Sequence, residues 1–340
     1  MDALSEILKT IRLTGAAFFA SELRAPWSIV APASRAIAEA LMPDADHVVP
    51  YHLVTAGRCL VKLVDGPAVD LAAGDVVVFP KGDHHLLGGT PQFGPRSIAP
   101  EDLTKLLKRG TVTPIRGGGD GEVTEMVCGF FACDARLSAP LIDGLPRVLR
   151  VSLRDDPGAG WLRSLMDFSV VETARRRVGA ATVLAKLSEL LFVETIRRYV
   201  EDLPDGETSW LAGLRNPHVA RALAFLHRRP EHAWTVEELA RKVGLSRTAL
   251  AERFMHYLGR PPIQYLTRWR LTLAADRLRD RTASIGRVAE QVGYDSEASF
   301  TRAFKRTFGL PPAAWRRTQA RPPVAAVREW SGSRREAVAA

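Results

Sequence analysis

The sequence predicts a multidomain α+β protein with an N-terminal β-barrel, a pair of linking helices and an all-α C-terminal region. Short apolar runs separated by turn residues fill the first part of the chain, a helical period begins at Trp161, and the last hundred residues contain an internal repeat. We therefore expect a β region over 1–155, a helical hairpin over 156–209, a repeated helical region over 210–319 and a disordered tail over 320–340.

The composition of the 340-residue chain is that of an ordinary globular protein, with 46% hydrophobic and 25% charged residues. No apolar run approaches the roughly 18 residues of a membrane helix, and the N-terminus has no secretory pattern. Three cysteines are too few for a disulfide framework, which favours a reducing compartment. We expect a cytoplasmic protein with no membrane partner.

The β region is punctuated by Gly, Pro and Asp turns at barrel or sandwich spacing. Its apolar runs are Val48–Leu53, Leu60–Val64, Val76–Phe79 and Met126–Phe131. Residues 91–122 interrupt the pattern and predict a mobile insertion with a short helix near Glu101–Lys108. This insertion lacks the strand, the spacing and the Lys-Ser/Thr pair of a phosphate loop.

Two apolar stripes at helical spacing follow, separated by Gly179-Ala180, and predict an αα-hairpin. The first stripe contains Leu162, Leu165, Met166 and Val170, and the second contains Leu184, Leu187, Leu191 and Ile196. Packing on the barrel and homodimerisation both fit such stripes, and we favour a homodimer. The segment Asp202–Ser209 then has the Pro, Asp and Gly content of a linker.

Positive charge is concentrated in the C-terminal third. Residues 216–340 hold 23 Lys and Arg against 11 Asp and Glu, a net charge of +12, whereas residues 1–215 hold 24 against 27, a net charge of −3. This asymmetry favours a basic module for a polyanion, joined to a near-neutral module with another task. Charge alone does not decide for nucleic acid, because basic surfaces often bind nothing specific.

The last hundred residues repeat with an offset of 49 to 50 positions. Ala240-Arg-Lys-Val-Gly244 recurs as Ala289-Glu-Gln-Val-Gly293, and the residues that follow recur as Leu250 and Phe300, Phe254 and Phe304, Gly259 and Gly309. Each unit predicts a helix, a Gly turn, a second helix and a Gly-x-Pro-Pro stop, which is typical of a helix-turn-helix. A long helix over about Ile263 to Leu278 is expected to hold both units rigidly, so that their second helices enter successive major grooves about 34 Å apart.

The second helix of each unit has a polar face opposite its apolar one. The residues expected to face outward are Arg247, Thr248, Glu252, Met255 and His256 in the first unit, and Ala298, Ser299, Arg302, Lys305 and Arg306 in the second. Arg302 suits a bidentate contact with guanine, and Glu252 can accept from a cytosine amino group. Lys305 and Arg306 lie later in the helix and are expected to touch phosphates.

The segment from Asn216 to Arg317 resembles the AraC/XylS-type DNA-binding domain of bacterial transcription regulators. The stretch Gly293-Tyr-Asp-Ser-Glu-Ala-Ser-Phe-Thr-Arg-Ala-Phe-Lys-Arg-Thr-Phe-Gly-Leu-Pro-Pro312 matches that family most closely. The resemblance implies a promoter-binding regulator rather than an enzyme, and leaves RNA polymerase open as a further partner. It also implies base contacts at Thr248, Ala251, Glu252, Ala298, Ser299 and Arg302. The two alanines depart from the polar residues often found there, although alanine can pack on a thymine methyl.

The stretch Gly74-Asp-Val-Val-Val-Phe-Pro-Lys-Gly-Asp-His-His85 fits the second cupin motif. Together with His52–Gly57, Ala25–Ser28 and Met126–Gly129, it makes the N-terminal half similar to the cupin-type sensor domain of a subgroup of AraC-type regulators. The resemblance implies a response to a small-molecule effector or to a stress signal.

The first cupin motif is missing, because Pro50 stands about where its Glu should be and no His-x-His precedes it. We therefore expect no metal, no cofactor and no catalytic residue. Candidate effector-binding residues are Trp27, His52, His84, His85, Cys128 and Cys133. Alternatives are a Zn²⁺ set of thiolates and imidazoles, redox or electrophile sensing with Cys133 as the more exposed thiol, buried core thiols, or a cupin metalloenzyme fused to a DNA-binding module.

Overall fold

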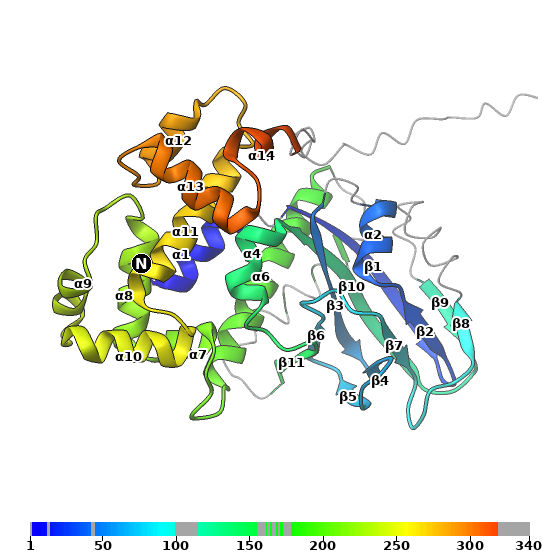
Figure 1. Ribbon diagram of the computed structural model, residues 1–340. Helices are drawn as coiled ribbons and strands as arrows, with labels where there is room; N and C mark the ends of the chain where they lie inside the picture. The colour runs from blue at the N-terminus through cyan, green and yellow to red at the C-terminus, as the bar shows by residue number, and fades with distance from the viewer. Residues whose placement is uncertain are drawn as a thin grey trace, which may run out of the picture.

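The computed structural model describes residues 2–11, 14–41, 45–98, 115–154 and 178–318, together with positions 161, 164, 168, 171 and 172. A β-rich N-terminal region lies beside a helical C-terminal region, and a group of helices that includes α4 and α6 lies between them (Figure 1). The multidomain α+β prediction is therefore confirmed. The helix expected near Glu101–Lys108, most of the first helix of the predicted pair and the tail 320–340 lie outside the described residues.

The N-terminal strands form two sheets. The six-stranded sheet has the order β11-β6-β3-β10-β1-β9, and the five-stranded sheet has the order β5-β4-β7-β2-β8. The strands of the first sheet are β1 (Thr14–Arg24), β3 (His47–Ala56), β6 (Asp75–Val78), β9 (Ile115–Gly118), β10 (Val123–Cys133) and β11 (Leu149–Ser152). Those of the second are β2 (Ser28–Ala31), β4 (Arg58–Leu63), β5 (Val69–Ala72), β7 (His85–Gly88) and β8 (Arg96–Ile98).

Alternation along the strands gives the six-stranded sheet two different faces. One face, with Cys128 and Phe130, packs into a cluster with Trp27 and Phe79, which we call the sensor interior after the role that the sequence resemblance implies. The other face, with Tyr51 and Phe131, packs under α6 (Ala180–Glu201). There, Tyr51 Oη lies 3.0 Å from Ser188 Oγ, and the Phe131 ring lies 5.2 Å from the Phe192 ring. The second helix of the predicted pair therefore packs on the sheet with one of its faces.

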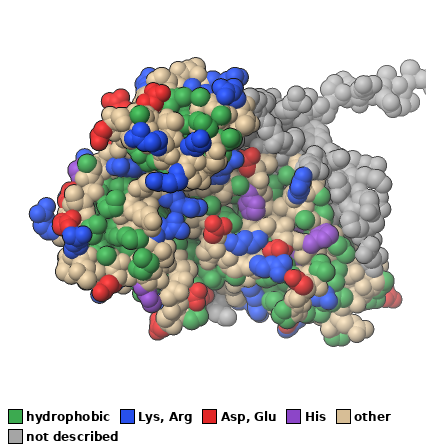
Figure 2. Space-filling view, in the orientation of Figure 1, with side chains coloured by type: hydrophobic (Ala, Val, Ile, Leu, Met, Phe, Trp, Pro, Cys, Tyr) green, Lys and Arg blue, Asp and Glu red, His purple; other side chains and the backbone are tan. Residues whose placement is uncertain are grey.

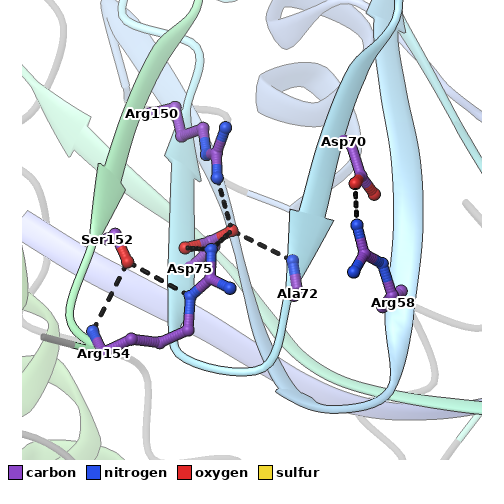
Figure 3. A network of polar contacts seen from close by, with 7 residues as sticks. All are labelled: Arg58, Asp70, Ala72, Asp75, Arg150, Ser152 and Arg154. Atoms are coloured by element: carbon purple, nitrogen blue, oxygen red, sulfur yellow. Dashed lines mark hydrogen bonds and ion pairs between the residues drawn. The ribbon is translucent and has the colours of Figure 1, made fainter.

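The buried carboxylate of Asp75 binds two arginines at the C-terminal end of the β region (Figure 3). Asp75 on β6 is fully buried and accepts hydrogen bonds from Arg150 Nη2 at 3.0 Å, from Arg154 Nη2 at 2.9 Å and from the Ala72 backbone at 3.0 Å. Arg154 also donates to Ser152 Oγ. These bonds hold β11 on the edge of the sheet, where the chain leaves the β region.

The helices of the remaining structure are short, apart from α6 and α11. In chain order they are α1 (Ala3–Thr10), α2 (Ser34–Leu41), α4 (Ala135–Ile142), α7 (Trp210–Arg215), α8 (Pro217–Arg228), α9 (Val236–Val243), α10 (Arg247–Leu258), α11 (Pro262–Arg277), α12 (Ile285–Gln291), α13 (Glu297–Phe308) and α14 (Pro312–Thr318). Among the described helices, none combines the length and apolar character needed to cross a membrane.

The apolar core does not stop at the boundary expected near residue 210. One cluster runs from Tyr51 and Phe131 on the sheet, through Ile7 on α1 and Phe192 on α6, to Phe254 on α10. A separate cluster around Phe300, Phe304 and Trp315 belongs to α11–α14. The first helix-turn-helix unit thus shares its core with the β region, whereas the second has a core of its own.

Candidate DNA-binding interface

The two repeated units form equivalent helix-turn-helix structures. The second helix of each, α10 and α13, has 12 residues and begins at a serine N-cap. Ser246 Oγ accepts from the Ala249 backbone, and Ser296 Oγ accepts from the Ser299 backbone. Because an N-cap side chain satisfies a backbone N–H that the helix leaves free, both helices start at a fixed residue.

A glycine with positive φ ends the first helix of each unit, but for different reasons. Gly244 has φ of 76° and open space where a Cβ would lie, so only its backbone conformation favours glycine. Gly293 has φ of 83°, and a Cβ there would lie 2.6 Å from the Glu231 carbonyl oxygen and 2.8 Å from Arg270 Nη2. The turn of the second unit therefore packs so closely on the α8–α9 loop of the first unit that a side chain at Gly293 would not fit.

Nearly all of the predicted DNA-contacting residues lie on the outer faces of α10 and α13. Seven of these side chains are exposed, namely Thr248, Glu252, His256, Ala298, Arg302, Lys305 and Arg306, while Ala251 and Ser299 are half-buried. Arg247 is exposed too, but pairs with Glu237 on α9 at 2.9 Å. The Ser299 hydroxyl donates to the Ser296 carbonyl and accepts from Ser296 Oγ, so it is already engaged in the cap of its own helix.

The arginines of the linking helix α11 contact different parts of the molecule. Arg270 donates to the carbonyls of Pro230 at 2.6 Å and His232 at 2.8 Å, both in the α8–α9 loop of the first unit. Arg277 donates to the Gln291 carbonyl in the second unit at 2.8 Å. These bonds fix both units on one helix, whereas Arg268 on the same helix is exposed.

A polar contact joins the second unit to the β region. Arg279, just after α11, lies 2.7 Å from Asp46 and 2.8 Å from Asp134, and the Arg136 guanidinium lies 4.2 Å from the centre of the Trp315 ring. We call these three contacts the clasp. Sequence reasoning missed it, because the residues in each contacting pair are more than 140 positions apart and no local pattern connects them.

His85 of the cupin motif meets His52 of β3 in the sensor interior. His85 Nδ1 lies 2.9 Å from the Asp83 carbonyl, so this nitrogen holds the proton and Nε2 accepts. His52 Nε2, 2.8 Å away, must then be the donor. Burial lowers the pKa of His85 to about 4 and that of His52 well below its usual value, so both rings are neutral near pH 7.

The cysteines do not form one site. Cys128 points into the sensor interior and Cys133 into the core under the helices, because residues five apart on β10 face opposite sides. Cys133 is slightly more exposed than Cys128, at 4% against 2%, but both thiols are buried, so neither is accessible as a sensor thiol would be. Burial raises the pKa of Cys133 to about 11 and that of Cys128 further, which is opposite to the lowered pKa of a reactive thiol.

The remaining candidate effector residues are also dispersed. Trp27 is fully buried in the sensor interior, whereas His84 is exposed on the surface. Within the described ranges, no three His, Cys, Asp or Glu side chains come close enough to hold a metal ion. The donor set therefore does not fit the metal of a metallo-cupin, and the zinc set considered above is not assembled.

The comparisons with known proteins agree with both halves of this description. Residues 2–201 match the family model of a cupin, and residues 239–318 match that of a helix-turn-helix domain. A putative AraC-like transcription regulator of Streptomyces lividans is 34% identical over 276 residues, covering 81% of this chain and 88% of that protein. The regulator AlkR of Acinetobacter baylyi is 29% identical over 330 residues, covering 93% of this chain and 99% of that protein.

Among solved structures, the DNA-binding domain of AdpA in complex with a target DNA is 31% identical, covering 30% of this chain and 91% of that chain with a TM-score of 0.28. The cupin match extends over more than half of the present sequence, and the Streptomyces relative aligns over most of both proteins. The chain therefore belongs to the AraC-type family of DNA-binding transcription regulators, with an N-terminal cupin region and a C-terminal helix-turn-helix domain.

Proposed function

We propose that this regulator binds a promoter through α10 and α13 and alters transcription when its cupin region receives a signal. The main support is that two helices of equal length, with equivalent serine caps, stand on one linking helix and expose polar outer faces. In this proposal residues 1–155 sense, 156–209 dimerise and 210–319 bind DNA in the cytoplasm, with RNA polymerase as a further partner and no catalytic step.

The proposed base contacts are the positions that the outer faces present to a major groove, namely Thr248, Ala251, Glu252, Ala298, Ser299 and Arg302. Arg247, His256, Lys305 and Arg306 surround them on the same faces. Ser299 must give up its bonds to Ser296 before it can bond a base, so we expect it to contribute least among the polar positions.

Selection of bound duplexes from a random-sequence pool by the full-length protein tests the DNA-binding proposal. We expect enrichment of a site with two half-sites about one helical turn apart, and an affinity that falls steeply with salt. The affinity for the selected duplex is then measured against a scrambled duplex at several salt concentrations. Equal affinity for both duplexes would contradict sequence-specific binding.

Exposed apolar side chains support the proposed homodimer. Six of the nine large hydrophobic residues that are exposed in the described structure lie between positions 161 and 190, namely Trp161, Phe168, Val171, Val178, Val183 and Leu190. Exposed apolar side chains concentrated in one part of a chain are typical of a protein–protein interface. We expect Leu190→Lys to shift sedimentation towards a monomer, whereas Val64→Lys, at an exposed valine on the β region, should leave the mass unchanged.

A small-molecule signal has more support than a thiol signal. Trp27 Nε1 and His52 Nδ1 are buried in the sensor interior without a hydrogen-bond partner among the described residues, and a polar effector could satisfy them. The cysteines, in contrast, are buried with raised pKa values. We expect Cys128→Ser and Cys133→Ser to keep the response in a reporter assay and Trp27→Phe to reduce it; loss of the response in either cysteine variant would favour redox sensing.

A further inference from the structure

A hollow of about 390 Å³ opens where the two helix-turn-helix units meet. It lies between the C-terminal ends of α10 and α13 and the flank of α11. Its polar lining consists of Arg260, Gln264, Thr267, Arg268, Arg306 and Thr307. Figure 2 shows Lys and Arg side chains gathered across the middle of this face, between the lobe of α12–α14 and the lobe of α8–α10. We call this feature the central hollow.

Three guanidinium groups converge on the central hollow without a carboxylate in its lining. Within the part of the chain that the structure describes, Arg260, Arg268 and Arg306 form no ion pair, although Arg260 Nε donates to the Leu258 carbonyl at 3.4 Å. Near them, Arg270 and Arg277 donate to backbone carbonyls and Arg279 pairs with carboxylates. Like charges repel, so an anion bound among these three arginines would be stabilised by all of them.

The donors of the central hollow suit a phosphate group. Arginine presents several N–H groups in a planar fork that matches phosphate oxygens, and Thr and Gln side chains add neutral donors. The Thr267 hydroxyl donates to the Ile263 carbonyl in the present structure, so it must turn before it donates to an anion. A free phosphate compound and the phosphates of a nucleic acid offer the same chemistry.

The position of the hollow favours the nucleic acid. If α10 and α13 enter successive major grooves, the sugar–phosphate backbone that borders the intervening minor groove crosses the space between them. We propose that the central hollow binds phosphate groups of the DNA backbone midway between the two half-sites. This inference rests on the proposed function, since it requires that both helices bind one duplex together.

The hollow would then fix the spacing of the half-sites without reading the DNA sequence. Contacts to phosphates position a protein on the duplex, whereas contacts to base edges determine which sequence it prefers. Its arginines are therefore distinct from Arg302, which is proposed to read a base. Removing them should weaken binding to all duplexes by a similar factor, and each lost phosphate contact should lower the salt dependence by about one unit.

The test uses the full-length protein and the duplex selected above. We expect Arg260→Ala/Arg268→Ala to lower affinity at least about tenfold on both selected and scrambled duplexes, and to lower the slope of log K against log salt by about two. Arg268→Lys should keep the slope, and Arg317→Ala, at an exposed position on α14, should change neither quantity. Unchanged thermal unfolding of the variants confirms that they fold.

Uncharged methylphosphonates at the central phosphates of the duplex provide the second arm. They should weaken binding of the wild-type protein but not that of the double variant, because the contacts they remove are already absent there. A loss that is the same in both proteins would overturn the inference. Inorganic pyrophosphate should not stabilise the wild-type protein against thermal unfolding more than it stabilises the double variant. If pyrophosphate protects the wild-type protein and the methylphosphonates have no effect, the hollow would be assigned to a free phosphate compound.

The two proposals fail in different ways. If the wild-type protein prefers its selected duplex and the double variant keeps the wild-type salt slope, the central hollow is not a phosphate site, although the proposed function stands. If the wild-type protein enriches no sequence from the random pool, both proposals are wrong.

Discussion

The two helix-turn-helix units have the same plan but are attached to the β region in different ways. The core of the first unit continues through α1 and α6 to the sheet, with Phe254 and Phe131 in one cluster. The second unit has a separate core around Phe304 and touches the β region through the clasp of Arg279 and Arg136. Apolar burial is large and insensitive to salt, whereas exposed ion pairs contribute little.

From this difference we expect the first unit to move with the β region and the second to be released more easily. Under the proposed function, a signal that alters the core of the β region would reach the first unit through packing. The second unit responds through α11 and the clasp.

Removal of one core ring from each unit should affect different parts of the chain. Phe254 and Phe304 are both fully buried, so Phe254→Ala and Phe304→Ala should each cost about 3–5 kcal/mol of folding free energy. Hydrogen exchange should show that Phe254→Ala lowers protection in the first unit and in the sheet, and that Phe304→Ala lowers it in the second unit alone. Equal loss of protection in the sheet would contradict the separation of the two cores.

Acid should destabilise the sensor and the first unit but not the second. Burial lowers the pKa of His227, in the first unit, to about 4, as it does for His85 in the sensor. The unfolded chain binds a proton below about pH 6.5 while the folded state does not, so each of these histidines costs up to about 3 kcal/mol as the pH falls from 6.5 to 4. The second unit has no histidine, since His256 is the last in the sequence.

Urea denaturation between pH 7 and pH 4.5, combined with hydrogen exchange, measures this difference. His227→Gln should flatten the pH dependence of the first unit, even if it lowers stability at pH 7. An equally steep acid loss in α12–α14 would show that the two units unfold together.

The outer faces should differ in what they recognise. Arg302→Ala should cost about 1–3 kcal/mol and relax specificity at one base pair, because a bidentate contact to guanine would be lost. Lys305→Ala, three residues later, serves as the matched control and should instead lower the salt slope by about one. Competition among duplexes with each base at the contacted position gives the answer, and a uniform loss for Arg302→Ala would make it a phosphate contact.

Opening of the clasp should have the smallest effect. Asp134 keeps its bonds to the backbone of Arg136 and Leu137 when Arg279 is removed, so Arg279→Ala should cost only about 1 kcal/mol or less. Faster hydrogen exchange in α14 should accompany it, and added salt should reproduce the effect in wild type. Arg281→Ala, at an exposed neighbouring position, is the control; if it loosens α14 equally, the clasp has no specific role.

The repeat was the strongest predictor of the C-terminal fold. Gly244 and Gly293 marked the turns that follow α9 and α12, and the linking helix expected over about Ile263 to Leu278 spans Pro262–Arg277, because caps and helical periods are local properties of a sequence. The alternation of strand residues would also have placed Cys128 and Cys133 on opposite faces, so the joint cysteine site could have been rejected from the sequence.

The contacts that connect the domains could not be predicted. Ala3, Ile7 and Ile11 recur at helical spacing and predict a buried face on α1, but nothing local indicates that this face covers α8 of the first unit. The four arginines of the linking region look alike in the sequence. Arg270 donates to carbonyls of the α8–α9 loop, Arg277 donates to the Gln291 carbonyl at the end of α12, and Arg279 pairs with carboxylates of the β region. Arg268 instead lines the central hollow.

The sequence by itself thus determined the elements, the repeat and the sides of α10 and α13 that face outward, because periodicity and capping depend on residues a few positions apart. Only the tertiary structure decided which unit shares a core with the β region, which arginines form no ion pair and which of them line the central hollow. Those properties depend on burial and charge contacts between residues that are distant in the chain. Because the hydrophobic effect is non-directional, the spacing of apolar residues does not reveal which distant segment will cover them.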